Sequence, residues 1–173
     1  MANCRLCHRV EPLRDSHIVP EFLYRPLRND KRQMSGINGR GRLGRRLIQR
    51  GLTEHLLCDA CEQHLSNTYE TPFLRSWLQA EALPRAAEPG STHPITVDYA
   101  PFKLFHLSIL FRSSASALPS FAPVSLGPHE ERLRQLLLAN DPGEDWQYPI
   151  AGNLVVHDRT REVLHIVGMP NLR

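Results

Sequence analysis

The sequence predicts an α+β fold, and three observations support this class. Two Cys-x-x-Cys pairs, Cys4/Cys7 and Cys58/Cys61, bracket the first third of the chain, with strand-like segments between them. Apolar residues recur at every fourth position after the second pair, which is the spacing of one helical face. Two more helical segments follow in the second half, and an alternating apolar segment near the end predicts a final strand pair.

The composition is that of a soluble globular protein. Of its 173 residues, 41% are hydrophobic and 23% are charged, which suits one compact domain or a small metal-stabilised module with a helical part behind it. The longest apolar segment, residues 101–111, is interrupted by Lys103 and His106 and therefore predicts a buried helix rather than a membrane span. The N-terminal residues lack the apolar region of a secretory signal, so we expect a cytoplasmic location.

The four cysteines have the spacing of a metal site. Disulfides are unusual in a reducing cytosol, and four thiolates suit the tetrahedral coordination of Zn²⁺. Unrelated buried cysteines are the alternative. His8 and His64 each lie close to a pair and rank below the thiolates as ligands. We therefore expect one structural Zn²⁺ bound by Cys4, Cys7, Cys58 and Cys61.

The segments around the first pair predict short elements in a defined order. Residues 1–20 predict a zinc knuckle followed by an extended segment. Residues 21–30 have helix-like apolar spacing, which Pro26 limits to one or two turns. Residues 33–46 are rich in glycine, lack periodicity and are predicted to be mobile. Order returns at residues 45–58, which predict a β-hairpin or strand pair ending at the second cysteine pair.

A helix is predicted to begin inside the second Cys-x-x-Cys pair. Thr71 and Pro72 have the form of a cap followed by proline at the first helical position, so we expect a division there. Knuckle, extended segment, hairpin and a helix carrying the last two ligands form the order of a treble-clef zinc module. The apolar stripe of the helix consists of Leu65, Tyr69, Phe73 and Trp77.

The second half is predicted to be mainly helical and to end in a β-hairpin. A proline-rich connection at residues 82–94 leads to an apolar helix around residues 101–112. An amphipathic helix follows around residues 128–139. Residues 153–168 predict two strands joined by a polar turn at residues 158–161. We expect two units, the second packed on the first: residues 1–81 and residues 95–173.

Positive charge is concentrated between residues 25 and 50. This segment holds nine lysines and arginines and one acid, whereas the whole chain has a net charge of +3. The Arg/Gly loop at residues 33–50 suits a nucleic-acid partner, because guanidinium groups make bidentate contacts to phosphate oxygens. A solvated loop that keeps the protein soluble is the alternative. The arginines expected to bind nucleic acid are Arg40, Arg42, Arg45, Arg46 and Arg50.

Three segments carry a resemblance to a known family: CRLC at residues 4–7, SHIVP at residues 16–20 and LLCDACEQHLSNTYE at residues 56–70. Through these segments, residues 4–70 resemble the HNH endonuclease superfamily, whose ββα-metal site is a treble clef. The remainder is similar to a C-terminal extension seen behind such modules in small bacterial proteins. This second similarity rests on the segments FKLFHLSILFRSS and LGPHEERLR.

The resemblance implies a phosphodiester hydrolase that cleaves or nicks nucleic acid, with DNA as the expected substrate. In the superfamily, a histidine at the end of the first strand takes a proton from water, and one divalent metal stabilises charge on the scissile phosphate. His17 occupies that place. The metal-ligand positions fall at Ser16 and Glu62, and a carboxylate is a sound ligand for Mg²⁺ or Mn²⁺. Glu70, about two helical turns after Glu62, is expected to support it.

The sequence departs from the family pattern at three places. Ser16 stands where an acid or a histidine is usual, and serine is a poor metal ligand. Asp15 can substitute for it only if the backbone turns differently. The asparagine that orients the histidine in the family falls near Thr53 or Glu54, and neither is an asparagine. Glu62 replaces the commoner histidine or asparagine.

Three functions remain open from the sequence. The first is the nuclease. The second is a zinc-dependent nucleic-acid-binding module without catalysis, and the third is a subunit whose apolar second half packs against a partner or a second copy. Under the last two, His17 is structural, and Glu62 and Glu70 lie on a solvated helix face or pair with arginines. Arg112 anchors a carboxylate or a phosphate, or is a plain charge at a helix C-terminus, which is the favoured interpretation.

Overall fold

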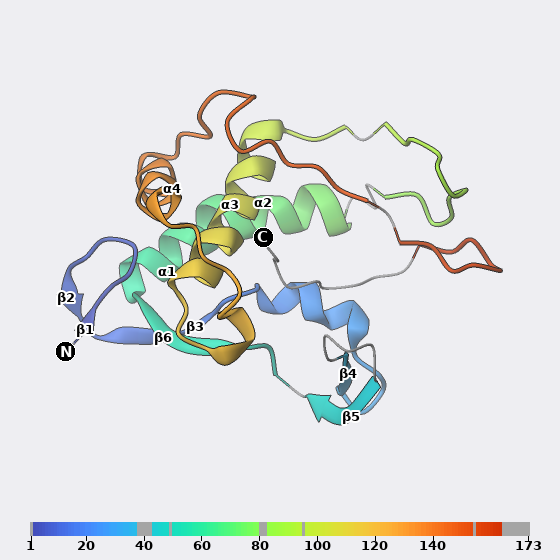
Figure 1. The fold of residues 1–173 in the computed structure, drawn as a ribbon, viewed down its shortest axis with the longest axis horizontal. Helices are drawn as coiled ribbons and strands as arrows, with labels where there is room; N and C mark the ends of the chain where they lie inside the picture. The colour runs from blue at the N-terminus through green and yellow to red at the C-terminus, as the bar shows by residue number, and fades with distance from the viewer. Residues whose placement is uncertain are drawn as a thin grey trace.

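A computed structural model describes residues 2–37, 43–48, 50–79, 83–94, 96–153 and 155–163. The described chain is an α+β structure, as predicted, with three two-stranded sheets and a body of helices (Figure 1). Among the described residues, no helix has both the length and the apolar character to span a membrane.

The first two strands enclose the first cysteine pair. Strand β1 (Ala2–Asn3) pairs antiparallel with β2 (Val10–Glu11). The turn between them is closed by two backbone hydrogen bonds, from the Cys4 N–H to the Arg9 carbonyl and from the His8 N–H to the Cys4 carbonyl, each 2.9 Å long. His8 has a left-handed φ of 62°, which lets the chain reverse direction directly after the cysteine pair.

Strand β3 (Leu13–His17) pairs antiparallel with β6 (Thr53–Cys58) and forms the ribbon beneath the helices. The register places Leu13 opposite Cys58 and His17 opposite Thr53. The ribbon therefore has the second cysteine pair at one end and His17 at the other.

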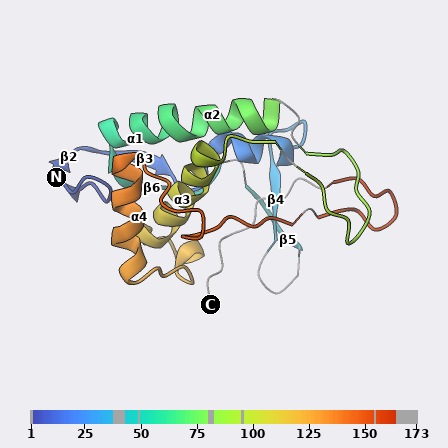
Figure 2. The same cartoon turned by 90° about the horizontal axis from the view of Figure 1, so that it is seen from above.

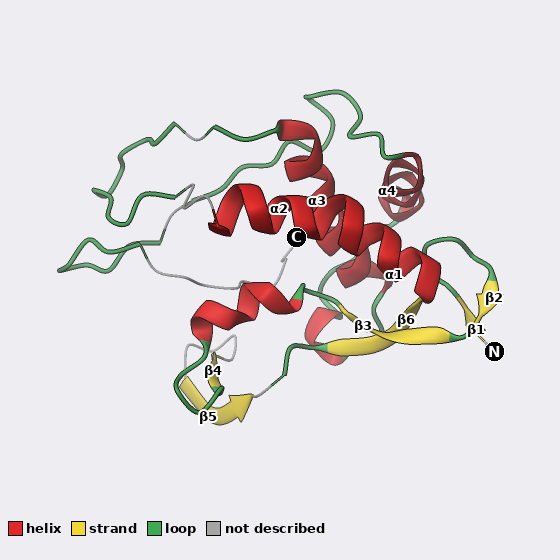
Figure 3. Cartoon of the chain, turned by 180° about the vertical axis from the view of Figure 1, so that it is seen from behind, coloured by secondary structure: helices red, strands yellow, loops and turns green. Residues whose placement is uncertain are grey.

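The basic segment contains a second strand pair. Strand β4 (Met34–Ile37) pairs antiparallel with β5 (Leu43–Ile48), apart from the β3–β6 ribbon (Figures 1 and 3). The prediction that residues 33–46 lack regular structure is therefore wrong for residues 34–37 and 43–46, whereas their mobility stays a prediction. The hairpin predicted within residues 45–58 is also wrong, because β5 pairs with the preceding strand β4, and β6 pairs with β3. Strand partners are chosen by long-range packing, which local periodicity does not report.

The helix after the second cysteine pair continues without a break. It comprises α1 (Asp59–Leu65), the π-helical segment η2 (Ser66–Glu70), α2 (Thr71–Phe73) and the π-helical segment η3 (Leu74–Gln79). The predicted division at Thr71 is wrong, since this residue has helical φ and ψ angles of −65° and −46°. The π-helical turn before Pro72 changes the hydrogen-bond pattern, so that the proline is accommodated within the helix.

The other helices follow the predicted order. The 3₁₀ helix η1 (Glu21–Leu27) includes Pro26 and is as short as predicted. Helix α3 (Tyr99–Ala115) crosses the long helical run, and α4 (Pro128–Ala139) packs near its α1 end (Figure 2). A short 3₁₀ turn, η4 (Pro119–Phe121), lies between them. In the described part of the predicted terminal hairpin, an isolated antiparallel bridge joins Val156 to Val163 across the predicted turn, and a second bridge joins Glu162 to Ala86. Residues 164–173 lie outside the description.

The buried core draws on both halves of the chain. The predicted stripe is confirmed: Leu65, Tyr69 and Phe73 are buried, and Trp77 packs against them. The rings of Phe73 and Phe105 stack with centroids 3.7 Å apart. Burying each such aromatic side chain stabilises the fold by roughly 1.5–3 kcal/mol. The proposed boundary between two units at residues 82–94 stays a prediction.

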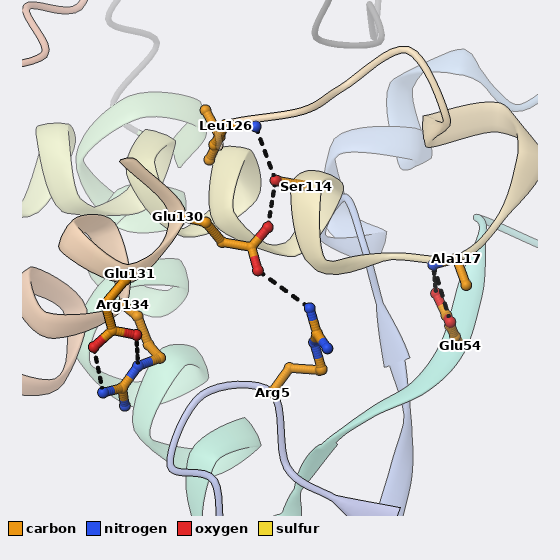
Figure 4. A network of polar contacts seen from close by, with 8 residues as sticks. All are labelled: Arg5, Glu54, Ser114, Ala117, Leu126, Glu130, Glu131 and Arg134. Atoms are coloured by element: carbon orange, nitrogen blue, oxygen red, sulfur yellow. Dashed lines mark hydrogen bonds and ion pairs between the residues drawn. The ribbon is translucent and has the colours of Figure 1, made fainter. Parts of the chain in front are cut away.

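Polar contacts join α4 to the cysteine knuckle and to α3 (Figure 4). The Glu130 carboxylate accepts from Arg5 at 3.1 Å and from the Ser114 hydroxyl at 2.5 Å. Arg134 donates to the Leu6 carbonyl at 2.7 Å. Leu6 lies between Cys4 and Cys7 in the sequence, so helix α4 supports the backbone that carries the first cysteine pair.

Candidate functional site

The four cysteines converge, as predicted. Their Sγ atoms all lie within 4.8 Å of one another, and the Cys7 and Cys58 Sγ atoms are 3.7 Å apart. A tetrahedral zinc site with Zn–S bonds of about 2.3 Å has Sγ atoms about 3.8 Å apart. The cluster could therefore hold a metal ion such as zinc. The turn between β1 and β2 provides one pair, and the junction of β6 with α1 provides the other.

Burial and backbone hydrogen bonds act in opposite directions on the cysteine thiols. Burial raises the pKa of Cys61 and of Cys58. Burial also opposes ionisation of Cys4, but the backbone N–H groups of Cys7, Cys58 and Leu6 lower its pKa below the ordinary value. One of these donors, the Cys58 N–H, lies 3.3 Å from the Cys4 Sγ. A bound metal would deprotonate its thiol ligands, and its positive charge would offset the cost of burying the thiolates close together.

The two nearby histidines are not part of the cluster. His8 is exposed, and the described metal-ligating group contains the four cysteines alone. The His64 ring Nε2 is 3.0 Å from the Leu137 carbonyl in the last turn of α4. The Tyr69 hydroxyl donates to the same carbonyl at 2.7 Å. His64 thus holds helix α4 against α1.

His17, Glu62 and Glu70 lie together in one open pocket of about 250 Å³. His17 is the last residue of β3, and Glu62 follows Cys61 in the first turn of α1. Glu70 ends the π-helical segment η2. The same helix that begins at the second cysteine pair therefore presents both carboxylates to His17. Their side chains come together as the sequence predicts, while their chemical roles stay predictions.

Glu62 has a buried oxygen without a hydrogen-bond partner. Its Oε1 atom is shielded from solvent and receives no hydrogen bond from the described residues. A buried carboxylate oxygen left unpaired is costly. A divalent cation in the pocket would satisfy it, since Mg²⁺ and Mn²⁺ prefer carboxylate oxygen ligands. Among the described residues, the four cysteines are the one cluster of three or more potential metal ligands, so a divalent cation at Glu62 stays a prediction.

Arg112 of α3 links Glu70 to His17. Its side chain is only 2% exposed, and its Nη1 atom donates to Glu70 Oε1 at 2.8 Å. The same nitrogen donates to the His17 carbonyl at 2.9 Å. The favoured interpretation of Arg112 as a plain helix C-terminal charge is wrong, and the alternative of a carboxylate anchor is confirmed. Glu70 Oε1 is thus engaged by arginine, while Glu62 Oε1 is not.

Ser16 faces away from the pocket. Its side chain is buried, and its Oγ accepts a hydrogen bond from the Leu57 N–H at 3.1 Å. Because side chains alternate along a strand, Asp15 and His17 share the opposite face of β3. The family's metal-ligand position at Ser16 therefore has no ligand in this chain. Asp15 lines a second pocket together with His17.

Among the described residues, no asparagine orients His17. The two positions where the family pattern has an asparagine, Thr53 and Glu54, have other contacts. Thr53 lies opposite His17 in the ladder. The Glu54 carboxylate accepts from the Ser116 hydroxyl at 2.6 Å, directly after α3. It also accepts from the Ala117 N–H (Figure 4). Glu54 is therefore committed to holding the C-terminal end of that helix.

Gly51 packs closely against His17 and was missed from the sequence. A Cβ atom at Gly51 would lie 2.6 Å from the Tyr24 Cε2 atom and 3.3 Å from the His17 Cδ2 atom. The backbone at Gly51 therefore fills the space between the two rings, and only glycine fits there without displacing one of them. A lone glycine two residues before strand β6 is the signal that could have identified it.

The second pocket, of about 490 Å³, adjoins the first and is mainly basic. Of the five arginines expected to bind nucleic acid, Arg50 lines it. Arg45 and Arg46 lie in β5, but their side chains are not described, and Arg40 and Arg42 lie outside the described residues. The full set lining the pocket is Asp15, His17, Glu21, Arg28, Lys31, Arg32, Arg50 and Thr53.

Comparisons with protein-family models, with curated proteins and with solved structures found no match to this chain. The resemblance of residues 4–70 to the HNH superfamily therefore stays a prediction from its motifs.

Proposed function

We propose that this protein is a metal-dependent nuclease of the HNH type that cleaves or nicks nucleic acid, with DNA as the expected substrate. The observation that supports this function best is the position of His17. It lies in one pocket with the unpaired Glu62 oxygen and borders a second pocket rich in arginine and lysine. A phosphodiester hydrolase needs this combination of a base, a metal ligand and a surface for phosphate.

The structural part of the proposal is a Zn²⁺ ion bound by the four cysteines. The β1–β2 turn and the start of α1 come from distant parts of the chain. A metal ion bound by cysteines from both would cross-link them. It also fixes the end of the β3–β6 ribbon opposite to His17. Zinc would then stabilise the fold and take no part in the reaction.

In the proposed reaction, His17 acts as the general base. Its neutral imidazole accepts a proton from a water molecule, and the water oxygen forms the new bond to phosphorus. The bond from phosphorus to the leaving oxygen breaks, and that oxygen takes a proton from solvent. Glu62 would hold a Mg²⁺ or Mn²⁺ ion, with Glu70 beside it. When bound, such an ion supplies charge stabilisation to the phosphate in the transition state.

Arg112 supports this arrangement without contacting the reacting atoms. Its hydrogen bond to the His17 carbonyl fixes the end of β3, and its ion pair with Glu70 neutralises one carboxylate of the pocket. Glu62 is left as the carboxylate available to a cation. Arg112 is therefore a positioning residue in this proposal.

A second candidate is a zinc-dependent nucleic-acid-binding module without catalysis. Two observations favour it: Ser16 points into the interior, and Glu54 is engaged at the end of α3. The chain thus lacks a metal ligand before His17 and an orienting side chain from β6. Under this alternative the basic pocket still binds phosphates, but no bond is broken.

Cleavage of supercoiled plasmid DNA separates the two candidates. Wild-type protein is expected to nick or linearise the plasmid with Mg²⁺ or Mn²⁺ added and to leave it intact without them. Glu62→Gln should lose activity at low metal concentration and recover part of it at high concentration, because a lost ligand weakens metal binding. Glu88→Gln, at an exposed carboxylate, is the matched control and should behave as wild type. Binding of DNA without cleavage under any divalent ion would favour the second candidate.

A further inference from the structure

Two pockets of opposite character share the wall formed by His17 and Glu21. The first is lined by three carboxylates, of Glu21, Glu62 and Glu70, and by the guanidinium groups of Arg25 and Arg112. The second is lined by four basic side chains and two acidic ones. A substrate that spans both pockets meets a surface for a cation on one side of His17 and a surface for an anion on the other.

The carboxylate between the pockets is already neutralised. Glu21 pairs with Arg28 at 2.6 Å and with Arg25 at 3.2 Å. Partial burial disfavours its charge, but these two arginines lower the pKa of Glu21 below its ordinary value. Its negative charge is therefore balanced within η1 and its C-terminal flank, and it does not cancel the other cations of the second pocket.

Three of those cations have no partner within the described structure. Lys31, Arg32 and Arg50 are exposed and form no ion pair with any described residue. Asp15 is the remaining carboxylate on this wall, which leaves the pocket with a net positive charge. Unpaired cations gathered around a concave surface favour a bound anion.

The loop that carries Lys31 and Arg32 is held in a fixed conformation. The Asn29 side-chain oxygen accepts from the Lys31 N–H at 3.0 Å and from the Gln33 N–H at 2.9 Å. The Asn29 carbonyl accepts from the Arg32 N–H at 2.8 Å, and Arg32 has a left-handed φ of 57°. These bonds fix the backbone of a tight turn, so less conformational entropy is lost when an anion binds to its side chains.

We propose that Lys31, Arg32 and Arg50 form a binding subsite for a phosphate group of a nucleic-acid strand, next to the phosphate that reacts at His17. The subsite rests on the proposed nuclease function for its substrate. A guanidinium group binds phosphate through two parallel hydrogen bonds, and lysine adds a point charge. The strand then runs from the basic pocket, past His17, to the carboxylates of Glu62 and Glu70.

The subsite has a kinetic signature. A phosphate held beside the reacting one is bound in the ground state and in the transition state alike. Loss of that contact is therefore expected to raise KM and leave kcat nearly unchanged. Such contacts fix the position of the strand without reading its sequence, so the effect should be the same for substrates of different sequence.

Binding of a small probe to the full chain tests the subsite without any cleavage. The probes are thymidine 3′,5′-bisphosphate and inorganic phosphate, titrated into ¹⁵N-labelled protein without added Mg²⁺ or Mn²⁺. We expect saturable shifts of the backbone amides at residues 29–33 and 50–53. The double variant Lys31→Gln/Arg32→Gln should bind the bisphosphate at least about tenfold more weakly, since hydrogen bonds to charged groups are lost.

The control variant is Arg132→Gln/Arg159→Gln, which removes the same charge from exposed positions outside the pocket. It should bind as wild type does. Equal weakening in the control would assign the effect to net charge and overturn the subsite. Inorganic phosphate binding as tightly as the bisphosphate would also overturn it, because it would indicate a site for free phosphate rather than for a strand.

Steady-state cleavage distinguishes failure of the subsite from failure of the proposed function. If wild type cleaves DNA and Lys31→Gln/Arg32→Gln has an unchanged KM, the subsite is wrong while the nuclease stands. If wild type cleaves nothing but bisphosphate binding still depends on Lys31 and Arg32, the nuclease is wrong while the phosphate subsite stands.

Discussion

Replacing Arg112 by lysine should weaken the link between Glu70 and the end of β3 at His17. The arginine Nη1 donates to both Glu70 Oε1 and the His17 carbonyl, and its Nε is 3.3 Å from the Ser108 carbonyl. Lysine keeps the positive charge but lacks the Nε and Nη2 groups, which donate to the Ser108 carbonyl and hydroxyl at 3.3 Å each. Its flexible ammonium therefore loses the contacts that orient Nη1 toward both Glu70 and the His17 carbonyl.

The expected loss follows from the number and burial of these bonds. One hydrogen bond to a charged group contributes about 1.5–3 kcal/mol. Arg112 is 2% exposed but Glu70 is 19% exposed, so we expect Arg112→Lys to lower the free energy of unfolding by about 1.5–2 kcal/mol, at the lower end of that range. Arg112→Ala would break a buried pair at about 3–5 kcal/mol, a large part of a typical total of about 5–15 kcal/mol, and is less informative.

Denaturant unfolding followed by tryptophan fluorescence measures the stability change, and plasmid cleavage measures the effect on kcat. Because the end of β3 is no longer anchored, kcat should fall by about tenfold to a hundredfold. A double-mutant cycle with Glu70→Gln should give a coupling energy of about 0.5–3 kcal/mol. Arg132→Lys, at an exposed site on α4, is the control. An Arg112→Lys protein as stable and active as wild type, or strictly additive effects in the cycle, would refute the bridging role of Arg112.

Three other predictions test the metal centre, the packing at His17 and the acid response. Cys58→Ser should lower the zinc content in elemental analysis and the melting temperature, because a Zn²⁺ ion held by the four cysteines would join distant segments; an unaltered melting curve contradicts this. Gly51→Ala should cost about 1–3 kcal/mol in denaturant unfolding and reduce cleavage, because its Cβ would lie 2.6 Å from a neighbouring ring atom; Gly152→Ala has no atom within 4 Å and should be neutral. Burial lowers the pKa of His106, and the hydrogen bond to the Phe102 carbonyl opposes this shift. The unfolded chain therefore binds the proton more tightly than the folded chain. The free energy of unfolding should fall as the pH drops below 6.5, the ordinary pKa of histidine. His106→Gln should flatten this pH dependence, and an unchanged slope would exclude His106 as its source.

The features that could be predicted from the sequence depend on local patterns. The ligand spacing of the two cysteine pairs predicts their convergence, because a metal site needs short turns that place two thiolates on each side. The stripe Leu65, Tyr69 and Phe73 follows from the helical period. The position of Glu62 directly after the last cysteine also fixes its direction, since both lie in the first turn of α1.

The features that could not be predicted depend on distant contacts. The pairing of β4 with β5 is one case, because glycine-rich composition obscured two strands whose partners only the fold selects. The burial of Arg112 is another, since it follows from α3 packing across the end of β3. The direction of Ser16 is different: strict alternation along β3 could have shown that it faces away from His17.

The most direct test of the central claim is plasmid cleavage by His17→Ala, measured beside its zinc content, melting temperature and DNA affinity. A general base acts in the transition state rather than in binding. The variant should therefore lose on the order of a hundredfold or more in rate while its zinc content, stability and DNA binding stay close to those of wild type. Cleavage that persists in His17→Ala, loss of zinc or unfolding on this substitution, or a wild-type protein that cleaves neither DNA nor RNA with any divalent ion, would contradict a catalytic role for His17.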